Sequence, residues 1–235
     1  MVTSGGRTER AVGTRELILV AAERLFAEHG VFAVSNRQVG EAAGQGNNFA
    51  VGYHFGAKAE LVRAIVRRHA EPVEEARSCM LAGIGRGAAV RDWVACLIRP
   101  FTGHLADLGV PTWYARFGAQ VMTDPGLRQI IVDEALATEP IQRVLDGLNR
   151  CLPALPLAVH VERSAMARTL MTHTCAERER ALAEGTPTSR SSWEDTAAGL
   201  VDAITGLWLA PVTATGARPG RTTQEAGAGS PDARR

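Results

Sequence analysis

Lysine is almost absent from this chain of 235 residues, and cysteines, aromatic residues and long apolar runs are few. The cysteines show no C-x-x-C spacing, which argues against a disulfide framework or a zinc site, so we expect small buried apolar thiols at Cys79, Cys96, Cys151 and Cys175. No apolar run approaches the length of a membrane span, and the N-terminus lacks the apolar core of a signal peptide. These absences favour a soluble protein in a reducing, cytoplasmic setting.

The basic residues are unevenly distributed along the chain. Arginine accounts for 25 of the 26 basic residues, and Lys58 is the single lysine. Residues 1–70 carry nine basic and six acidic side chains, an excess of +3, whereas the remainder sums to −2. This asymmetry is compatible with a basic, nucleic-acid-binding module beside a nearly neutral one, although it does not require one.

Helical periodicity runs through the sequence, and no alternation typical of strands is present. Apolar residues recur at i, i+3, i+4 and i+7 from Thr14 to His29, and Gly30 is a natural helix stop. Longer helical patterns follow to residue 210, with Pro140 splitting or kinking the stretch 125–151. We therefore predict an all-α protein. Its expected parts are a flexible arm over 1–12, a DNA-binding domain over 13–70, a helical body over 71–210 and a disordered tail over 211–235.

Short helices separated by glycines crowd the region between His29 and Lys58. Ser35 and Gln38 fit a capping box at the start of a second helix that Gly44 closes. A short third helix is expected from about Asn47 to Tyr53, and a fourth begins near Lys58, with Pro72 bending or ending it. This layout indicates a helix-turn-helix, whose second helix enters the major groove of DNA. The alternative is an ordinary three-helix segment of a larger bundle.

Three sequence stretches resemble the N-terminal domain of the TetR/AcrR family of bacterial transcription regulators. They are Ala-Ala-Glu-Arg-Leu-Phe-Ala-Glu-His-Gly (21–30), Glu-Ala-Ala-Gly (41–44) and Tyr-His-Phe-Gly-x-Lys-x-x-Leu (53–61). The resemblance covers about a quarter of the chain and is greatest to actinobacterial members, which are rich in Arg and Ala. It implies a homodimer that binds a palindromic double-stranded DNA operator.

The resemblance also implies roles for individual residues of the first quarter. Ser35, Asn36 and Arg37 would start the helix that braces the DNA backbone, and Asn47, Asn48 and Phe49 would occupy the reading positions. Tyr53 and His54 form an aromatic pair near the backbone, and Lys58 would hold a phosphate. The chain departs from the family pattern at Gln45-Gly46, which adds one residue to the turn, at Gly52 and at Ala57.

Aromatic and methionine residues recur at helical spacing in the body. They are either ordinary core or the lining of a pocket for an apolar or amphipathic effector. The candidate lining residues are Trp93, Leu97, Phe101, Trp113, Phe117, Met166 and His173. Small residues in the last two patterns, about 159–184 and 192–210, permit close helix approach inside one chain or between two. Together with the family resemblance, they favour a dimer interface built from two copies of these helices over a purely intramolecular core.

These observations lead to a transcriptional regulator, most simply a repressor that a small molecule releases from its operator. We find no convincing catalytic triad, paired carboxylates, metal-ligand spacing or phosphate-binding glycine loop, so we expect neither enzymatic activity nor a cofactor. The alternative is a small-molecule carrier or enzyme built on a helical bundle. DNA binding in a gel-shift assay would separate the two.

Overall fold

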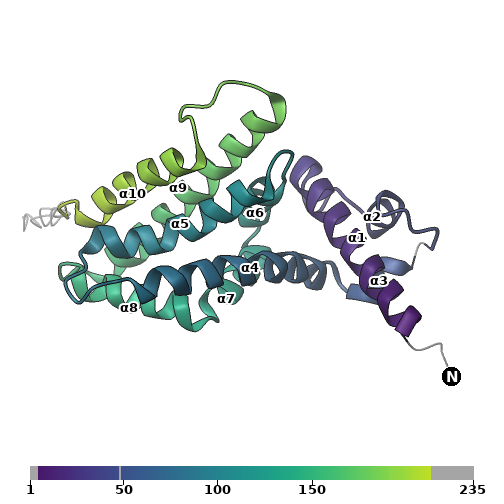
Figure 1. Cartoon of the computed structure of the whole chain (residues 1–235), viewed down its shortest axis with the longest axis horizontal. Coiled ribbons are helices and arrows are strands. Elements are labelled where there is room, and N and C mark those ends of the chain that lie inside the picture. Colours follow the sequence, from purple (N-terminus) through teal and green to yellow (C-terminus); the bar gives the residue numbers. More distant parts are fainter. Residues whose placement is uncertain (1–4, 48, 213–235) are drawn as a thin grey trace, which may run out of the picture.

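A computed structural model describes residues 5–47 and 49–212, and these residues form α-helices joined by short loops (Figure 1). The helices are α1 (Gly5–His29), α2 (Asn36–Ala42), α3 (Ala50–Phe55), α4 (Lys58–Ala82), α5 (Val90–Leu108), α6 (Tyr114–Met122), α7 (Pro125–Leu136), α8 (Glu139–Cys151), α9 (Leu157–Glu184) and α10 (Trp193–Leu209). The prediction of an all-α chain is therefore confirmed. Figure 1 shows α1, α2 and α3 at one end, here called the head, and the body of α5 to α10 beyond α4.

The first helix is longer than its apolar pattern indicates. It ends at His29, as predicted, where Gly30 adopts a φ of +86° that favours glycine. It begins at Gly5, however, so the predicted flexible arm is wrong over residues 5–12. Apolar periodicity identifies only the part of a helix that packs against a core, and the sequence before Thr14 has no such pattern. Residues 1–4 lie outside the described part of the chain, as do Asn48 and residues 213–235 of the predicted tail.

The second and third helices differ in how well local signals define them. The capping box of α2 is confirmed, because the Ser35 hydroxyl accepts from the Gln38 amide and the Gln38 side chain accepts from the Ser35 amide at 2.8 Å. The predicted start of α3 at Asn47 is wrong by three residues. Asn47 Oδ1 accepts from the Phe49 amide at 2.9 Å, which stabilises a turn before the helix begins at Ala50.

Helix α4 passes through the expected domain boundary at residue 70 without ending. Pro72 lies inside it, and the helix continues to Ala82. A proline inside a helix removes one backbone donor, but the buried face continues on both sides of it, from Leu61 to Leu81. Packing along this face keeps α4 helical, so the head and the body share one helix.

The body is a bundle whose elements cap and brace one another. The stretch 125–151 is split into α7 and α8 as the position of Pro140 predicts, with Pro140 in the first turn of α8. The buried Glu179 of α9 accepts from the backbone amides of Ala115 and Arg116 at 3.1 and 2.9 Å, which caps the N-terminus of α6. Burial raises the pKa of Glu179.

The apolar residues of α10 are used inside the chain's own core. Leu200, Val201, Ile204 and Trp208 are all buried and pack with residues of α5, α6 and α9. These four side chains are therefore not available to a second copy of the chain. The side of α10 that remains exposed carries Ala203, Gly206 and Leu209 instead.

No helix in the described residues is long and apolar enough to cross a membrane.

Candidate nucleic-acid interface and effector site

The turn between α2 and α3 has the tight geometry of a helix-turn-helix. Gly44 ends α2 with a φ of +68°, and the Gln45 amide donates to the Gly40 carbonyl at 2.9 Å. A Cβ on Gly40 would lie 3.9 Å from Val51 Cγ2, so the two helices approach closely at a glycine. Val39 and Val51 are buried behind the turn and fix the angle between the helices.

Two aromatic side chains stand out from this turn and from α3. Phe49 is 81% exposed and Tyr53 is 84% exposed, and Asn47 beside them is also exposed. Large contiguous apolar patches are costly in water and are therefore candidate binding surfaces. The structure thus gathers Asn47, Phe49 and Tyr53 on one exposed region at α3. His54 is half-buried and makes an edge contact with Tyr53 at 5.2 Å between ring centroids.

The predicted backbone-bracing residues lie at the N-terminus of α2. Ser35 is the N-cap, and its hydroxyl is occupied by the capping box. Arg37 is exposed and pairs with Glu41 of the same helix at 2.7 Å, and the hydrogen bond from Arg37 to Glu41 raises the pKa of Arg37. Asn36 is half-buried in the first turn. The helix N-terminus with its exposed arginine is a suitable site for a phosphate.

Lys58 has a structural role that the sequence pattern does not predict. Its ammonium donates to the carbonyls of Val31 and Val34 at 2.9 and 2.6 Å and thereby holds the loop between α1 and α2. Partial burial lowers the pKa of Lys58, and Phe32 lies 6.0 Å away, measured from Nζ to its ring centroid. Two of the three N–H groups are therefore used internally.

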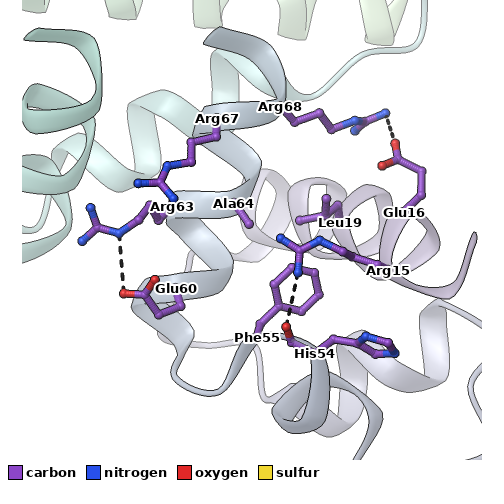
Figure 2. Close-up of a pocket in the computed structure, with 10 residues that line it drawn as sticks. All are labelled: Arg15, Glu16, Leu19, His54, Phe55, Glu60, Arg63, Ala64, Arg67 and Arg68. Carbon is purple, nitrogen blue, oxygen red and sulfur yellow. Dashed lines mark hydrogen bonds and ion pairs between the residues drawn. The ribbon is translucent and has the colours of Figure 1, made fainter. Parts of the chain in front are cut away.

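Arg15 is a residue of the head that sequence reasoning missed. Its guanidinium lies 4.3 Å from the centroid of the Phe55 ring, and Nη1 donates to the His54 carbonyl at 3.3 Å, so Arg15 joins α1 to the end of α3 (Figure 2). No signal in the sequence separates Arg15 from the other polar residues of α1. Beside it lies an open cavity of about 460 Å³, along which α4 contributes Glu60, Arg63, Ala64, Arg67 and Arg68.

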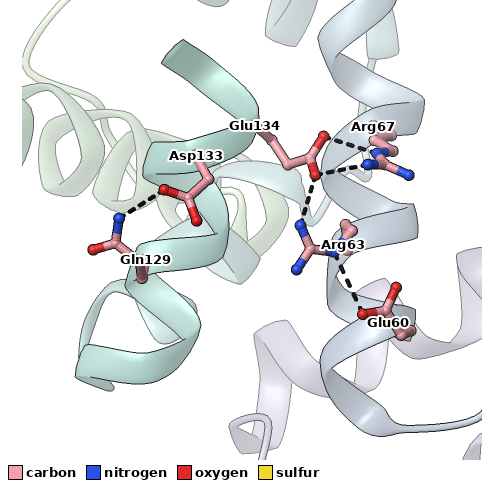
Figure 3. A network of polar contacts seen from close by, with 6 residues as sticks. All are labelled: Glu60, Arg63, Arg67, Gln129, Asp133 and Glu134. Atoms are coloured by element: carbon pink, nitrogen blue, oxygen red, sulfur yellow. Dashed lines mark hydrogen bonds and ion pairs between the residues drawn. The ribbon is translucent and has the colours of Figure 1, made fainter. Parts of the chain in front are cut away.

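A second contact joins the head end of α4 to α7. Glu134 accepts from Arg63 Nη1 at 2.8 Å and from Arg67 Nε and Nη2 at 2.8 and 3.0 Å (Figure 3). Hydrogen bonds from the two arginines hold the pKa of Glu134 below its ordinary value. Neighbouring Asp133 points away and bonds only to Gln129 of its own helix among the residues drawn in Figure 3.

A buried polar cluster, also missed from the sequence, connects three helices at the junction of head and body. Glu23 of α1 bonds to His69 of α4 at 2.8 Å, and His69 bonds in turn to His104 of α5 at 2.7 Å. Tyr114 of α6 stacks on His69 with 3.7 Å between ring centroids. These residues come from helices that are far apart in the sequence, so only the folded structure reveals that they are in contact.

The residues predicted to line an effector pocket do not form one cavity. Phe117 is fully buried and stacks on Phe26 of α1 at 6.4 Å, where it belongs to the core shared by the head, α6 and α7. Trp113 packs against the same core, whereas Trp93, Leu97 and Phe101 pack in the core of the body. Met166 and His173 are exposed on α9.

A smaller cleft lies between α4 and α5. Its volume is about 160 Å³, and its lining combines apolar side chains with Arg99, His104 and Asp107. None of the seven predicted pocket residues is part of this lining.

Comparisons with known proteins agree with the fold. Residues 18–65 match the family described as "Bacterial regulatory proteins, tetR family", and residues 95–206 match "Tetracyclin repressor-like, C-terminal domain". Over 137 residues the chain is 37% identical to the HTH-type transcriptional repressor AcnR of Corynebacterium efficiens, a match that covers 54% of this chain and 64% of that protein, slightly under two thirds of its length.

A solved TetR family transcription regulator from Marinobacter aquaeolei VT8 shares the fold at 16% identity, with a TM-score of 0.56 and coverage of 85% of this chain and 97% of that one. The two matched segments contain the helix-turn-helix and most of the body. The chain therefore belongs to the TetR family of bacterial transcriptional regulators.

Proposed function

We propose that the protein is a homodimeric repressor that binds a palindromic DNA operator through α2 and α3 and is released by a small apolar or amphipathic molecule. The observation that carries the proposal is the exposed set Asn47, Phe49 and Tyr53 beside a capped helix N-terminus. The Corynebacterium relative is named a repressor, and we extend that direction of regulation to this chain.

Each group of the head has a distinct part in the proposed complex. Asn47 and the neighbouring Asn48, which lies outside the described residues, would contact base edges, because an amide both donates and accepts hydrogen bonds. Tyr53 and Phe49 would contact sugar and thymine methyl groups. Arg37 and the amides of the α2 N-terminus, together with the third N–H group of Lys58, would bind phosphates.

The dimer would form through the exposed sides of α9 and α10. Met166 and Leu170 lie one turn apart on α9, and they are 47% and 39% exposed. The exposed side of α10 carries Ala203 and Gly206, whose small size permits close helix approach, and Leu209. Pairing two such surfaces gives a four-helix interface with two-fold symmetry.

Selection from a random double-stranded DNA pool, at a fixed salt concentration, tests DNA recognition and identifies the operator in the same experiment. We expect the full chain to enrich a palindromic sequence. Arg37→Ala should weaken binding to every enriched sequence and reduce the dependence of affinity on salt. The matched control is Arg143→Ala on α8, which also removes an exposed arginine paired within its helix, to Glu139. Enrichment of no sequence would refute the proposal.

Assembly needs a separate experiment. Leu170→Asp places a charge in the proposed interface and should give a monomer in light scattering. Leu136→Asp, at a residue of α7 with similar exposure (42% against 39%), should remain dimeric. A dimer in both variants would place the interface elsewhere.

A further inference from the structure

The cluster at the junction of head and body is a continuous hydrogen-bonded chain with a defined direction. Glu23 is 5% exposed and His69 is 2% exposed, so water does not compete for their bonds. Arg68 Nη1 lies 3.4 Å from Glu23 Oε2 and supplies a positive charge that balances the carboxylate. This series of hydrogen bonds begins at Glu23 on α1 in the head and ends at His104 on α5 in the body.

With both imidazoles neutral, a carboxylate at Glu23 determines which nitrogen of each ring carries the proton. In this arrangement His69 Nε2–H donates to the carboxylate, and His69 Nδ1 is left as an acceptor. His104 Nε2–H then donates to His69 Nδ1, and His104 Nδ1 is an acceptor as well. Burial lowers the pKa of His104 to about 4, although Asp107 and Glu23 oppose this, so His104 is neutral at pH 7.

His104 also lines the cleft between α4 and α5. In the part of the chain that the structure describes, no protein group bonds to its Nδ1. The cleft walls include the apolar residues Pro72 and Met80 of α4 and Pro100 of α5, together with the charged residues Arg99 and Asp107 of α5. Its volume of about 160 Å³ is close to the roughly 150 Å³ of a protein cavity that holds benzene.

We propose that this cleft binds a small, neutral, largely apolar molecule with one hydroxyl group, which donates its hydrogen bond to His104 Nδ1. Bonds in a chain polarise one another, so donation at His104 strengthens the bonds from His104 to His69 and from His69 to Glu23. Occupancy of the cleft thereby tightens the attachment of α1 to α4 and α5. Its consequence for transcription rests on the proposed function, whereas binding and tightening do not.

Phenol and toluene are suitable probes, because they have nearly the same size and only phenol has a hydroxyl donor. The full chain, labelled with ¹⁵N in its six histidines, is titrated with each probe while the imidazole nitrogens are followed by NMR. We expect phenol to shift the signals of His104 and, more weakly, His69, and to leave His160 and His173 unchanged. Toluene should leave the His104 Nδ1 signal unchanged. Equal responses to both probes, or no response to phenol, would overturn the proposal.

Amide hydrogen exchange tests the tightening of α1. Phenol should slow exchange several-fold around Glu23 in the wild-type chain. In Glu23→Gln, which keeps the side-chain shape and removes the charge, phenol should still shift His104 but no longer protect α1. If phenol protects α1 equally in both proteins, the hydrogen bonds from His104 to Glu23 do not transmit the effect of binding, and this part of the proposal is refuted. If Glu23→Gln does not fold, amide exchange of α1 in the wild-type chain is compared with phenol and with toluene. Equal protection by the two probes refutes transmission through these hydrogen bonds.

The two proposals fail in different experiments. Phenol binding with no enriched DNA sequence would remove the proposed function and leave the binding site. An enriched operator with no response of His104 to phenol would support the proposed function and remove the proposed binding site.

Discussion

A methyl group added at Gly147 should destabilise the protein, although it would normally strengthen a helix. An ideal Cβ at this position of α8 would lie 2.4 Å from Trp93 Cζ2 and 2.5 Å from Cδ2 and Cε2. Carbon atoms in contact are separated by about 3.5–4.0 Å, so the indole ring would have to move by roughly 1 Å. Trp93 packs against two clusters of the core and has little room to do so.

The magnitude follows from two opposing terms. Replacing glycine by alanine inside a helix contributes about 1 kcal/mol of stability, and overpacking a core costs about 1–3 kcal/mol. We therefore expect Gly147→Ala to lower the free energy of unfolding by about 0–2 kcal/mol. Gly118→Ala in α6, where nothing lies within 4 Å of the added Cβ, should raise it by up to about 1 kcal/mol.

Urea denaturation at one fixed protein concentration measures both variants, because the stability of a dimer depends on concentration. Combining Gly147→Ala with Trp93→Leu, which removes the ring, should abolish most of the additional cost. If Gly147→Ala stabilises the protein as much as Gly118→Ala does, the close packing of Trp93 on α8 is wrong.

Three further predictions concern the junction, the loop before α2 and the last helix. Glu134→Gln should lower stability at pH 7, while Asp133→Asn should not. Because the pKa of Glu134 is held below its ordinary value, the difference should be complete above about pH 5 and disappear as pH falls through that lowered pKa, as denaturation at several pH values would reveal. Lys58→Ala should lower the melting temperature by releasing the loop between α1 and α2, and should also reduce the salt slope of DNA binding by about one unit per subunit; an unchanged melting temperature would contradict its contacts. Removing 192–210 should unfold the body, seen by circular dichroism, since α10 supplies core residues; a folded monomer would contradict this.

The parts of the fold that could be predicted from the sequence depend on local physics. The capping box at Ser35, the stop at Gly30 and the split before Pro140 each require only a few neighbouring residues. The continuation of α4 through Pro72 depends on packing against other helices, and the early start of α1 has no apolar signal. For α10, the apolar pattern shows that one face is buried, but it does not show whether the chain's own core or a second copy of the chain covers that face.

The candidate site divides in the same way. The exposed positions around α3 follow from the turn pattern and the family resemblance, and the structure gathers Asn47, Phe49 and Tyr53 there. The pocket residues could not be predicted, because helical spacing selects core and cavity residues alike; Phe117, for instance, is fully buried in packed core. The chain from Glu23 to His104 joins helices far apart in sequence, and a single sequence contains no information about such pairs.

The single lysine of the chain also gives the protein an intrinsic chemical reporter. Any reagent that acylates amines has one side-chain target, Lys58, apart from the N-terminal amine. The Lys58 amine is held by the carbonyls of Val31 and Val34, so opening of the loop between α1 and α2 should make it react faster. The rate of its modification, followed by mass spectrometry, therefore reports changes in the opening of this loop.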